Sequence, residues 1–180
     1  MKFGFVLLCA LPLVAADAPT ASIGKILDNQ LRMVENEFLP LAEAMPADKY
    51  SFAPTQGEFK GVRTFAQQVS HTAAVMYMVS AALLGQKNPS EPGPNENGPA
   101  SLKSKDDIVK YLKDAFAYAH QAMATITDQN ATELIPPPFG TRKTPRLAIA
   151  NENIWHAFDH YGQMVVYARM NGIVPPASRR

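Results

Sequence analysis

Residues 155–163 read Trp155-His156-Ala157-Phe158-Asp159-His160-Tyr161-Gly162-Gln163. Two histidines spaced four residues apart lie on one face of a helix, one turn from each other, so that both imidazoles can reach one metal ion. A third histidine, His71, stands far upstream. If another helix brings it to the same point, three imidazole nitrogens meet and leave coordination positions open, which is typical of metal sites that do chemistry. This pattern favours a fold in which two distant helical segments pack face to face.

The first 18 residues have the features of a secretory signal peptide. A basic start, Met1-Lys2, precedes an apolar run that extends from Phe3 to Ala15, and small residues suited to signal peptidase follow before residue 19. The run is too short to span a membrane. We therefore expect cleavage near residue 18 and an exported protein, periplasmic or extracellular, with no membrane span after cleavage. An uncleaved anchor is the alternative.

Cysteine is confined to this N-terminal run, because the single cysteine of the chain is Cys9. A chain cleaved after it has no disulfide, no thiolate nucleophile and no cysteine metal ligand. Any sulfur chemistry would then have to come from a substrate.

Length and charge narrow the class of protein further. Residues 19–180 are enough for one domain with a substantial core. The whole chain has 17 basic and 16 acidic residues, so that no basic field is available to bind nucleic acid. The expected partner is a small-molecule substrate or ligand, not nucleic acid.

Apolar residues recur at helical spacing in four segments, and no segment convincingly predicts a strand. In the first segment Pro40 is expected to kink or end the helix early. The second segment extends from about Val62 to Leu84, and Gly85 is expected to end it. The apolar stripe of the first segment consists of Leu27, Leu31, Val34, Phe38, Leu41 and Met45.

The third and fourth segments begin with capping signals. Ser104 is the predicted N-cap of the third, and two aspartates follow in its first turn, where the helix dipole favours them. In the fourth, Thr144 is the predicted cap and Pro145 the first helical residue. The fourth segment is expected to end near Gly172. Residues 86–103 and 131–143, rich in proline and glycine, are expected to be irregular loops. The predicted fold is all-α, a four-helix bundle, and the long link between the second and third helices permits a crossover.

Helical phase tests where the histidines point. His71 shares its face with apolar residues of the second segment, which predicts that it looks into the bundle. In the fourth segment a polar seam replaces the aliphatic residues usual at a helix interface. Buried without partners, such groups cost roughly 1–3 kcal/mol each. We therefore favour an inward seam around a metal, made of His156, His160, Gln163 and Tyr167.

Two observations keep other arrangements open. The opposite face of the fourth segment is also apolar, so that it needs a cover, either the proline-rich loops or a second copy of the chain in a homodimer. An inward histidine can also be a neutral, hydrogen-bonded core residue that binds no metal. His120 lies at the edge of the third segment's apolar stripe, and we interpret it as a rim or surface residue.

Longer motifs around the histidines resemble those of the DinB/YfiT-like proteins. Upstream, the resemblance is carried by Tyr50-Ser51-Phe52-Ala53-Pro54 and by Phe65-Ala66-Gln67-Gln68-Val69-Ser70-His71. Downstream, it is carried by His156-x3-His160-Tyr161-Gly162-Gln163-x3-Tyr167-Ala168-Arg169-x2-Gly172-Ile173-Val174-Pro175-Pro176. It covers about residues 23–176.

The resemblance implies a four-helix bundle with up-down-down-up topology, which suits a long crossover between helices 2 and 3. It also implies a divalent metal ion, zinc or nickel, held by His71, His156 and His160. Some proteins of the family are thiol-dependent transferases, and others are named as metal-dependent hydrolases. An exported chain departs from this pattern, because low-molecular-weight thiols are mainly cytosolic reagents.

If the site is catalytic, the metal activates either a water or an incoming thiol. Asn153, Asp159 and Gln163 are near enough in sequence to orient the imidazoles, and Tyr167 is a candidate to line the pocket. Glu152, one turn before His156, is a candidate for a general base. The alternative is a bundle without turnover, either a metal-stabilised protein that binds a small ligand or a purely structural module.

Overall fold

The computed structural model describes residues 21–179, and the predicted signal peptide therefore lies outside the described residues. Four long helices dominate this part of the chain: α1 (Ile23–Ala44), α2 (Phe65–Leu84), α3 (Lys105–Met123) and α4 (Arg146–Met170). Three short 3-10 helices and two short strands lie in the connections: η1 (Ala47–Lys49), η2 (Pro94–Glu96), η3 (Pro176–Ser178), β1 (Leu134–Ile135) and β2 (Thr144–Pro145).

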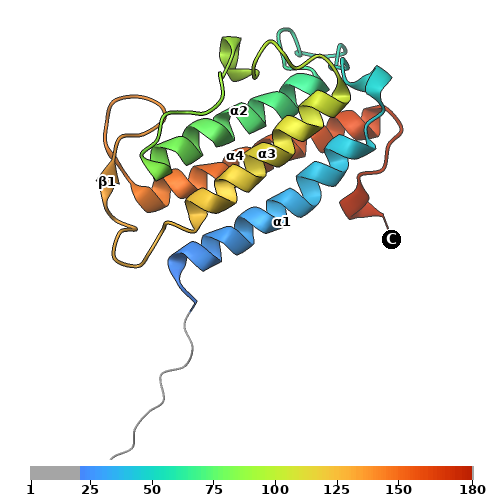
Figure 1. Ribbon diagram of the computed structural model, residues 1–180. Coiled ribbons are helices and arrows are strands. Elements are labelled where there is room, and N and C mark those ends of the chain that lie inside the picture. The colour runs from blue at the N-terminus through green and yellow to red at the C-terminus, as the bar shows by residue number, and fades with distance from the viewer. Residues whose placement is uncertain (1–20, 180) are drawn as a thin grey trace, which may run out of the picture.

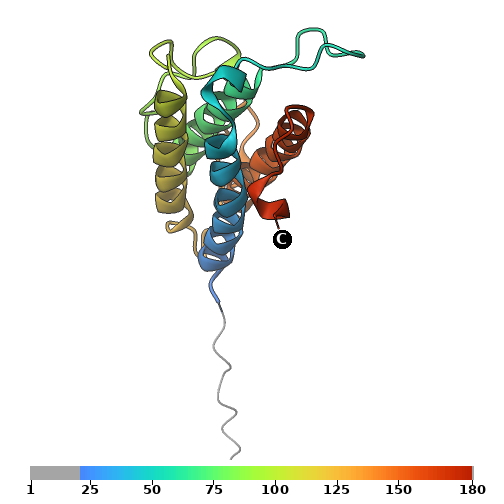
Figure 2. The same cartoon turned by 90° about the vertical axis from the view of Figure 1, so that its right-hand side faces the viewer.

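The four helices form a bundle with up-down-down-up topology, as predicted (Figure 1). Helices α1 and α4 run in one direction, whereas α2 and α3 run in the other, because the segment between α2 and α3 returns along the bundle. Helix α2 packs against α3 and α4, and α1 packs against the same two helices. Figure 2 shows the segment between η1 and α2 extending away from one end of the bundle.

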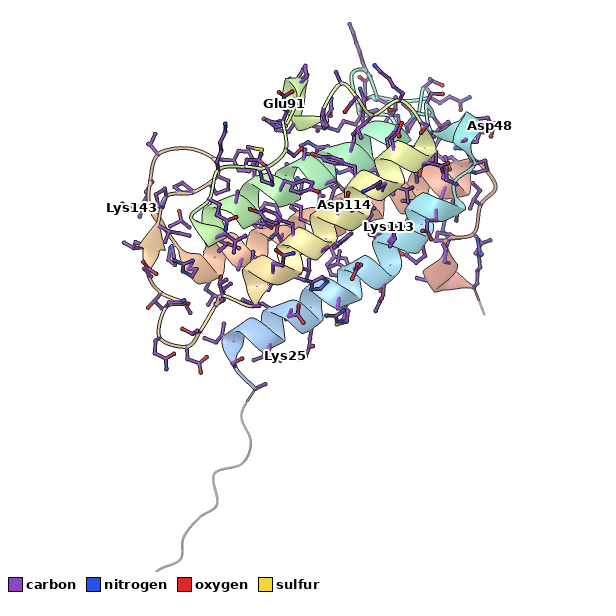
Figure 3. All side chains as sticks on the ribbon, in the orientation of Figure 1. Lys25, Asp48, Glu91, Lys113, Asp114 and Lys143 are labelled. Atoms are coloured by element: carbon purple, nitrogen blue, oxygen red, sulfur yellow. The ribbon has the colours of Figure 1, made fainter. Side chains whose placement is uncertain are left out.

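The core explains why these segments are helical. Phe38 of α1 and Phe116 of α3 are fully buried and meet edge to face, with ring centroids 6.3 Å apart. The stripe predicted for the first segment is buried along its whole length, from Leu27 to Met45. Charged side chains such as Lys113 and Asp114 lie on the outside of the bundle (Figure 3). Among residues 21–179, no helix combines the length and the apolar character that a membrane crossing needs.

Pro40 does not end α1 early. The helix continues to Ala44, with Pro40 inside it. Proline removes one backbone hydrogen bond and crowds the preceding turn. Here Leu41 and Ala42, directly after the proline, are fully buried, and their packing stabilises the last turn in spite of that loss.

The start of α2 differs from the prediction, whereas its end and the start of α3 agree with it. Helix α2 begins at Phe65 and not near Val62, because Thr64 and Gln67 form a reciprocal capping box. Its end at Gly85, in the left-handed conformation with φ 64°, is as predicted. The N-cap of α3 is Ser104, also as predicted.

The predicted start of α4 is wrong. Thr144 caps no helix, and Pro145 precedes the first helical residue, Arg146. Both residues instead form β2, which pairs antiparallel with β1. The expectation that the chain contains no strand is therefore wrong at this one small ladder. A two-residue strand is too short to show the alternation by which strands are recognised.

Candidate metal centre

The three predicted histidines meet between α2 and α4. The Nε2 atom of His156 lies 3.3 Å from Nε2 of His71 and 3.1 Å from Nε2 of His160. One ligand atom from each residue lies within 4.8 Å of the other two. The i, i+4 spacing places two of these imidazoles on α4, and the packing of α2 against α4 supplies the third.

The donor set fits a divalent metal ion. Zinc–nitrogen distances of about 2.0–2.1 Å and tetrahedral angles place two ligand nitrogens about 3.3 Å apart. The two measured separations, 3.1 and 3.3 Å, are close to that value. Three neutral imidazoles are ligands of intermediate softness and suit zinc, nickel, copper or iron. His71, His156 and His160 can therefore hold one such ion.

Burial keeps all three imidazoles neutral near pH 7. It lowers the pKa of His156 to about 3 and that of His160 to about 4, and the positive charges of neighbouring groups, including Arg63, act in the same direction. Burial and the charge of Arg63 also lower the pKa of His71. A neutral imidazole is the form that binds a metal.

The segment between α2 and α3, which contains η2, fixes the orientation of His71. Its Nδ1 donates a hydrogen bond of 3.0 Å to the backbone carbonyl of Glu96. A carbonyl can only accept, so that the proton sits on Nδ1 and the Nε2 lone pair faces the other histidines. Asn95 and Glu96 both have positive φ, 54° and 51°. This turn is closed tightly at Gly93, where a Cβ atom would collide with the carbonyl oxygen of Gly98.

A relay of amides fixes the orientation of His160. Its Nδ1 lies 2.5 Å from Oε1 of Gln68, and the amide nitrogen of Gln68 donates to Oε1 of Gln163 at 2.9 Å. Gln163 in turn donates to the Asp159 carboxylate at 3.1 Å. Partners of this kind fix the tautomer of a metal-binding histidine and raise its basicity. Two of the predicted orienting residues, Asp159 and Gln163, thus act on His160 through Gln68.

The other residues singled out near the seam lie apart from the imidazoles. Asn153 is buried, and its amide donates to Ser80 Oγ at 3.2 Å. The hydroxyl of Tyr167 donates to the Arg63 carbonyl at 3.2 Å. Glu152 is half-buried, which raises the pKa of its carboxyl. Within residues 21–179 no hydrogen bond joins any of these three side chains to a histidine.

His120 lies between α3 and α1, away from the other histidines. Its Nδ1 meets the Asp28 carboxylate at 2.5 Å, and its Nε2 meets Glu35 at 3.1 Å. Both ring nitrogens thus have a carboxylate of α1 as partner. These partly buried contacts tie α3 to α1.

Three groups at the centre were not predicted as functional: Gln68, the Glu96 carbonyl and Arg63. Gln68 lies one turn before His71, so that its spacing would have placed it on the same face. The Glu96 carbonyl belongs to an irregular loop whose path no periodicity describes. Arg63 precedes the N-cap of α2, and only the folded loops bring it to the site.

The comparisons with known proteins agree with this architecture. The sequence profile of the DinB superfamily matches residues 30–164. The fold is similar to that of a conserved protein from Enterococcus faecalis, with a TM-score of 0.67, 16% identity, and coverage of 84% of this chain and 98% of that one. It is also similar to a DinB-like protein from Bacillus cereus, with a TM-score of 0.63, 20% identity, and coverage of 86% and 96%. No curated protein matches the chain.

Proposed function

This chain belongs to the DinB superfamily, and from that membership and its converging histidines we propose that it is a metal-dependent enzyme acting on a small molecule. The reaction is of the hydrolase or the thiol-transferase type. The observation that carries the proposal is the meeting of three Nε2 atoms, two of them on imidazoles whose Nδ1 protons are engaged elsewhere.

His71, His156 and His160 would hold the ion, zinc or nickel. A divalent ion with three neutral histidine ligands keeps a position open and lowers the pKa of a water or thiol that binds there. The fixed tautomers of His71 and His160 support this role, because both Nε2 lone pairs are already directed to the centre before the ion binds.

The remaining residues restrict the chemistry. Residues 21–179 contain no cysteine, so that no protein thiolate competes for the metal or attacks the substrate. A protein nucleophile is not required if the substrate itself or water supplies the attacking atom.

We also propose that the chain is exported. The support is the basic start and the short apolar run before residue 19. Mass analysis of the N-terminus of the protein recovered from the medium or periplasm tests this. An intact Met1 on a protein confined to the cytoplasmic fraction would refute the proposal.

Catalysis is tested by a screen of the metal-loaded chain against thiols paired with electrophiles, and against esters and amides. We expect turnover that disappears both after chelation and in the double variant His156→Ala/His160→Ala, whereas His120→Ala keeps it. Stoichiometric metal without turnover of any of these substrates would instead support a metal-stabilised protein that binds a ligand without converting it.

A further inference from the structure

A cavity of about 680 Å³ opens beside the metal centre. His160 forms part of its wall, together with the start of α2 and the η2 segment, so that a molecule bound in the cavity lies next to one of the three converging histidines. The wall is mostly polar, and its residues include Arg63, Gln67, Asn97, Asp159 and Gln163. This cavity is where a substrate would be recognised.

Arg63 is the one arginine of this wall, and its guanidinium is held in place by two contacts. Its Nε donates to Oδ1 of Asn97 and its Nη2 donates to the Asn95 carbonyl, both at 2.9 Å. Both acceptors are uncharged. The two bonds orient the planar fork before any ligand arrives, which reduces the entropy lost on binding.

The charge of Arg63 is not neutralised by an ion pair. Within residues 21–179 every salt bridge involves other residues, and none includes Arg63. The side chain is half-buried and lines the same cavity as His160. A half-buried, oriented and unpaired guanidinium is suited to bind a carboxylate with two parallel hydrogen bonds.

The carboxylates of Asp159 and Glu96 also belong to the wall, and their negative charges oppose the binding of an anion. Asp159 is exposed and accepts a hydrogen bond from Gln163. With a divalent ion on the histidines, the ion and Arg63 together carry one positive charge more than the two carboxylates neutralise. The loaded cavity therefore favours an anion over a neutral molecule.

We propose that Arg63 binds a carboxylate of the substrate while another group of the same molecule reaches the metal centre. The substrate class is accordingly a small carboxylic acid. This inference rests on the proposed function, because it assumes that a metal ion occupies the histidine site.

Two thiols with the same two-carbon spacer between the sulfur and the polar group test the proposal with a readout other than turnover. 3-Mercaptopropionate carries a carboxylate where 2-mercaptoethanol carries a neutral hydroxyl. Binding of either to the cobalt-loaded protein is followed by the thiolate-to-cobalt absorption band. We expect the wild type to bind the carboxylate probe about tenfold or more tightly than the neutral one.

In Arg63→Gln this preference should fall to about twofold or less, whereas Arg63→Lys should retain part of it. Arg142→Gln, which removes an exposed arginine outside the cavity wall, is the matched control and should behave like the wild type. Unchanged cobalt stoichiometry and melting temperature show that Arg63→Gln is folded and loaded. If Arg63→Gln does not bind cobalt, the cobalt-loaded Arg63→Lys variant is measured in its place. A partial or full loss of the preference for the carboxylate probe in this variant supports the proposal, and an unchanged preference overturns it.

Failure of this inference differs from failure of the proposed function. Cobalt bound by the wild type, with equal affinity for the two probes or with a preference that survives Arg63→Gln, overturns the role of Arg63 alone. A wild-type chain that takes up no cobalt overturns the metal site and this inference with it.

Discussion

Replacing Gln68 by leucine tests whether the amide relay prepares His160 for the metal. Gln68 is 2% exposed, and its side chain joins His160 to Gln163. Leucine has a similar size but no acceptor for the Nδ1 proton. The imidazole then loses the bond that fixes its tautomer, and part of the population carries its proton on Nε2, the atom that must face the metal.

The size of the effect follows from these contacts. The loss of a buried partner leaves an unsatisfied N–H, which costs about 1–3 kcal/mol. Removal of a residue that orients a metal ligand typically weakens metal affinity about 10- to 100-fold. At 1.4 kcal/mol for each factor of ten, these two ranges agree. We expect Gln68→Leu to bind zinc about 10- to 100-fold more weakly than the wild type, and Gln68→Glu, which keeps an acceptor, to remain close to it.

Competition with a chromophoric chelator at pH 7 measures the affinity, and circular dichroism measures the helix content and melting temperature. Gln30→Leu is the matched control, because Gln30 is an exposed glutamine of α1 and the same substitution there removes no histidine partner. If Gln68→Leu binds zinc within about twofold of the wild type while His160→Ala abolishes binding, the relay does not prepare the site.

Three further predictions concern other parts of the fold. His120→Ala should keep full metal affinity but lower the melting temperature, because it removes the partner of Asp28 and Glu35; a loss of metal in this variant would contradict the separation of the two histidine sites. Burial raises the pKa of Asp28, but hydrogen bonds from His120 and Arg32 outweigh it and hold that pKa below its usual value. A carboxyl with a lowered pKa contributes stability above its unfolded pKa of about 3.9, and the contribution is lost as the pH falls through the folded pKa. Urea unfolding should therefore give Asp28→Asn a lower free energy of unfolding than the wild type, and this difference should shrink as the pH falls from about 6 to about 3. A difference that stays constant over this pH range would refute the prediction. Gly93→Ala should weaken metal binding through His71, because the added Cβ meets the Gly98 carbonyl and displaces the turn that presents the Glu96 carbonyl; unchanged affinity in a chelator titration would show that this turn does not orient His71.

The bundle could be predicted because its core obeys helical periodicity. The stripe that includes Phe38 and Leu41 is buried as its spacing indicates, and the packing of these residues even outweighs Pro40. The same reasoning placed His71 and His160 in the interior, where the structure has both. Apolar spacing thus determines which face of each helix is inside, and the histidines on that face are brought together with it.

The details that periodicity does not control were harder to predict. Thr64 and Gln67 have the spacing of a capping box, a signal that sets the start of α2 three residues after Val62, where the apolar periodicity begins. The pairing of Thr144 with Ile135 depends on a partner that local sequence does not reveal. The Glu96 carbonyl reaches His71 only because Gly93 closes a turn of unusual backbone conformation, and Arg63 is placed by contacts to that same loop. The ligands and the orienting residues of their own helix, Asp159 and Gln163, could therefore be predicted from spacing, whereas the groups supplied by loops, the Glu96 carbonyl and Arg63, could not.

The central claim is that His71, His156 and His160 together hold one divalent metal ion. Elemental analysis of the purified chain after metal-replete refolding and gel filtration measures this most directly. We expect about one zinc or nickel ion per chain in the wild type, and almost none in His156→Ala/His160→Ala. Less than about a tenth of an equivalent in the wild type would contradict the account, because the converging histidines would then be neutral residues of the core.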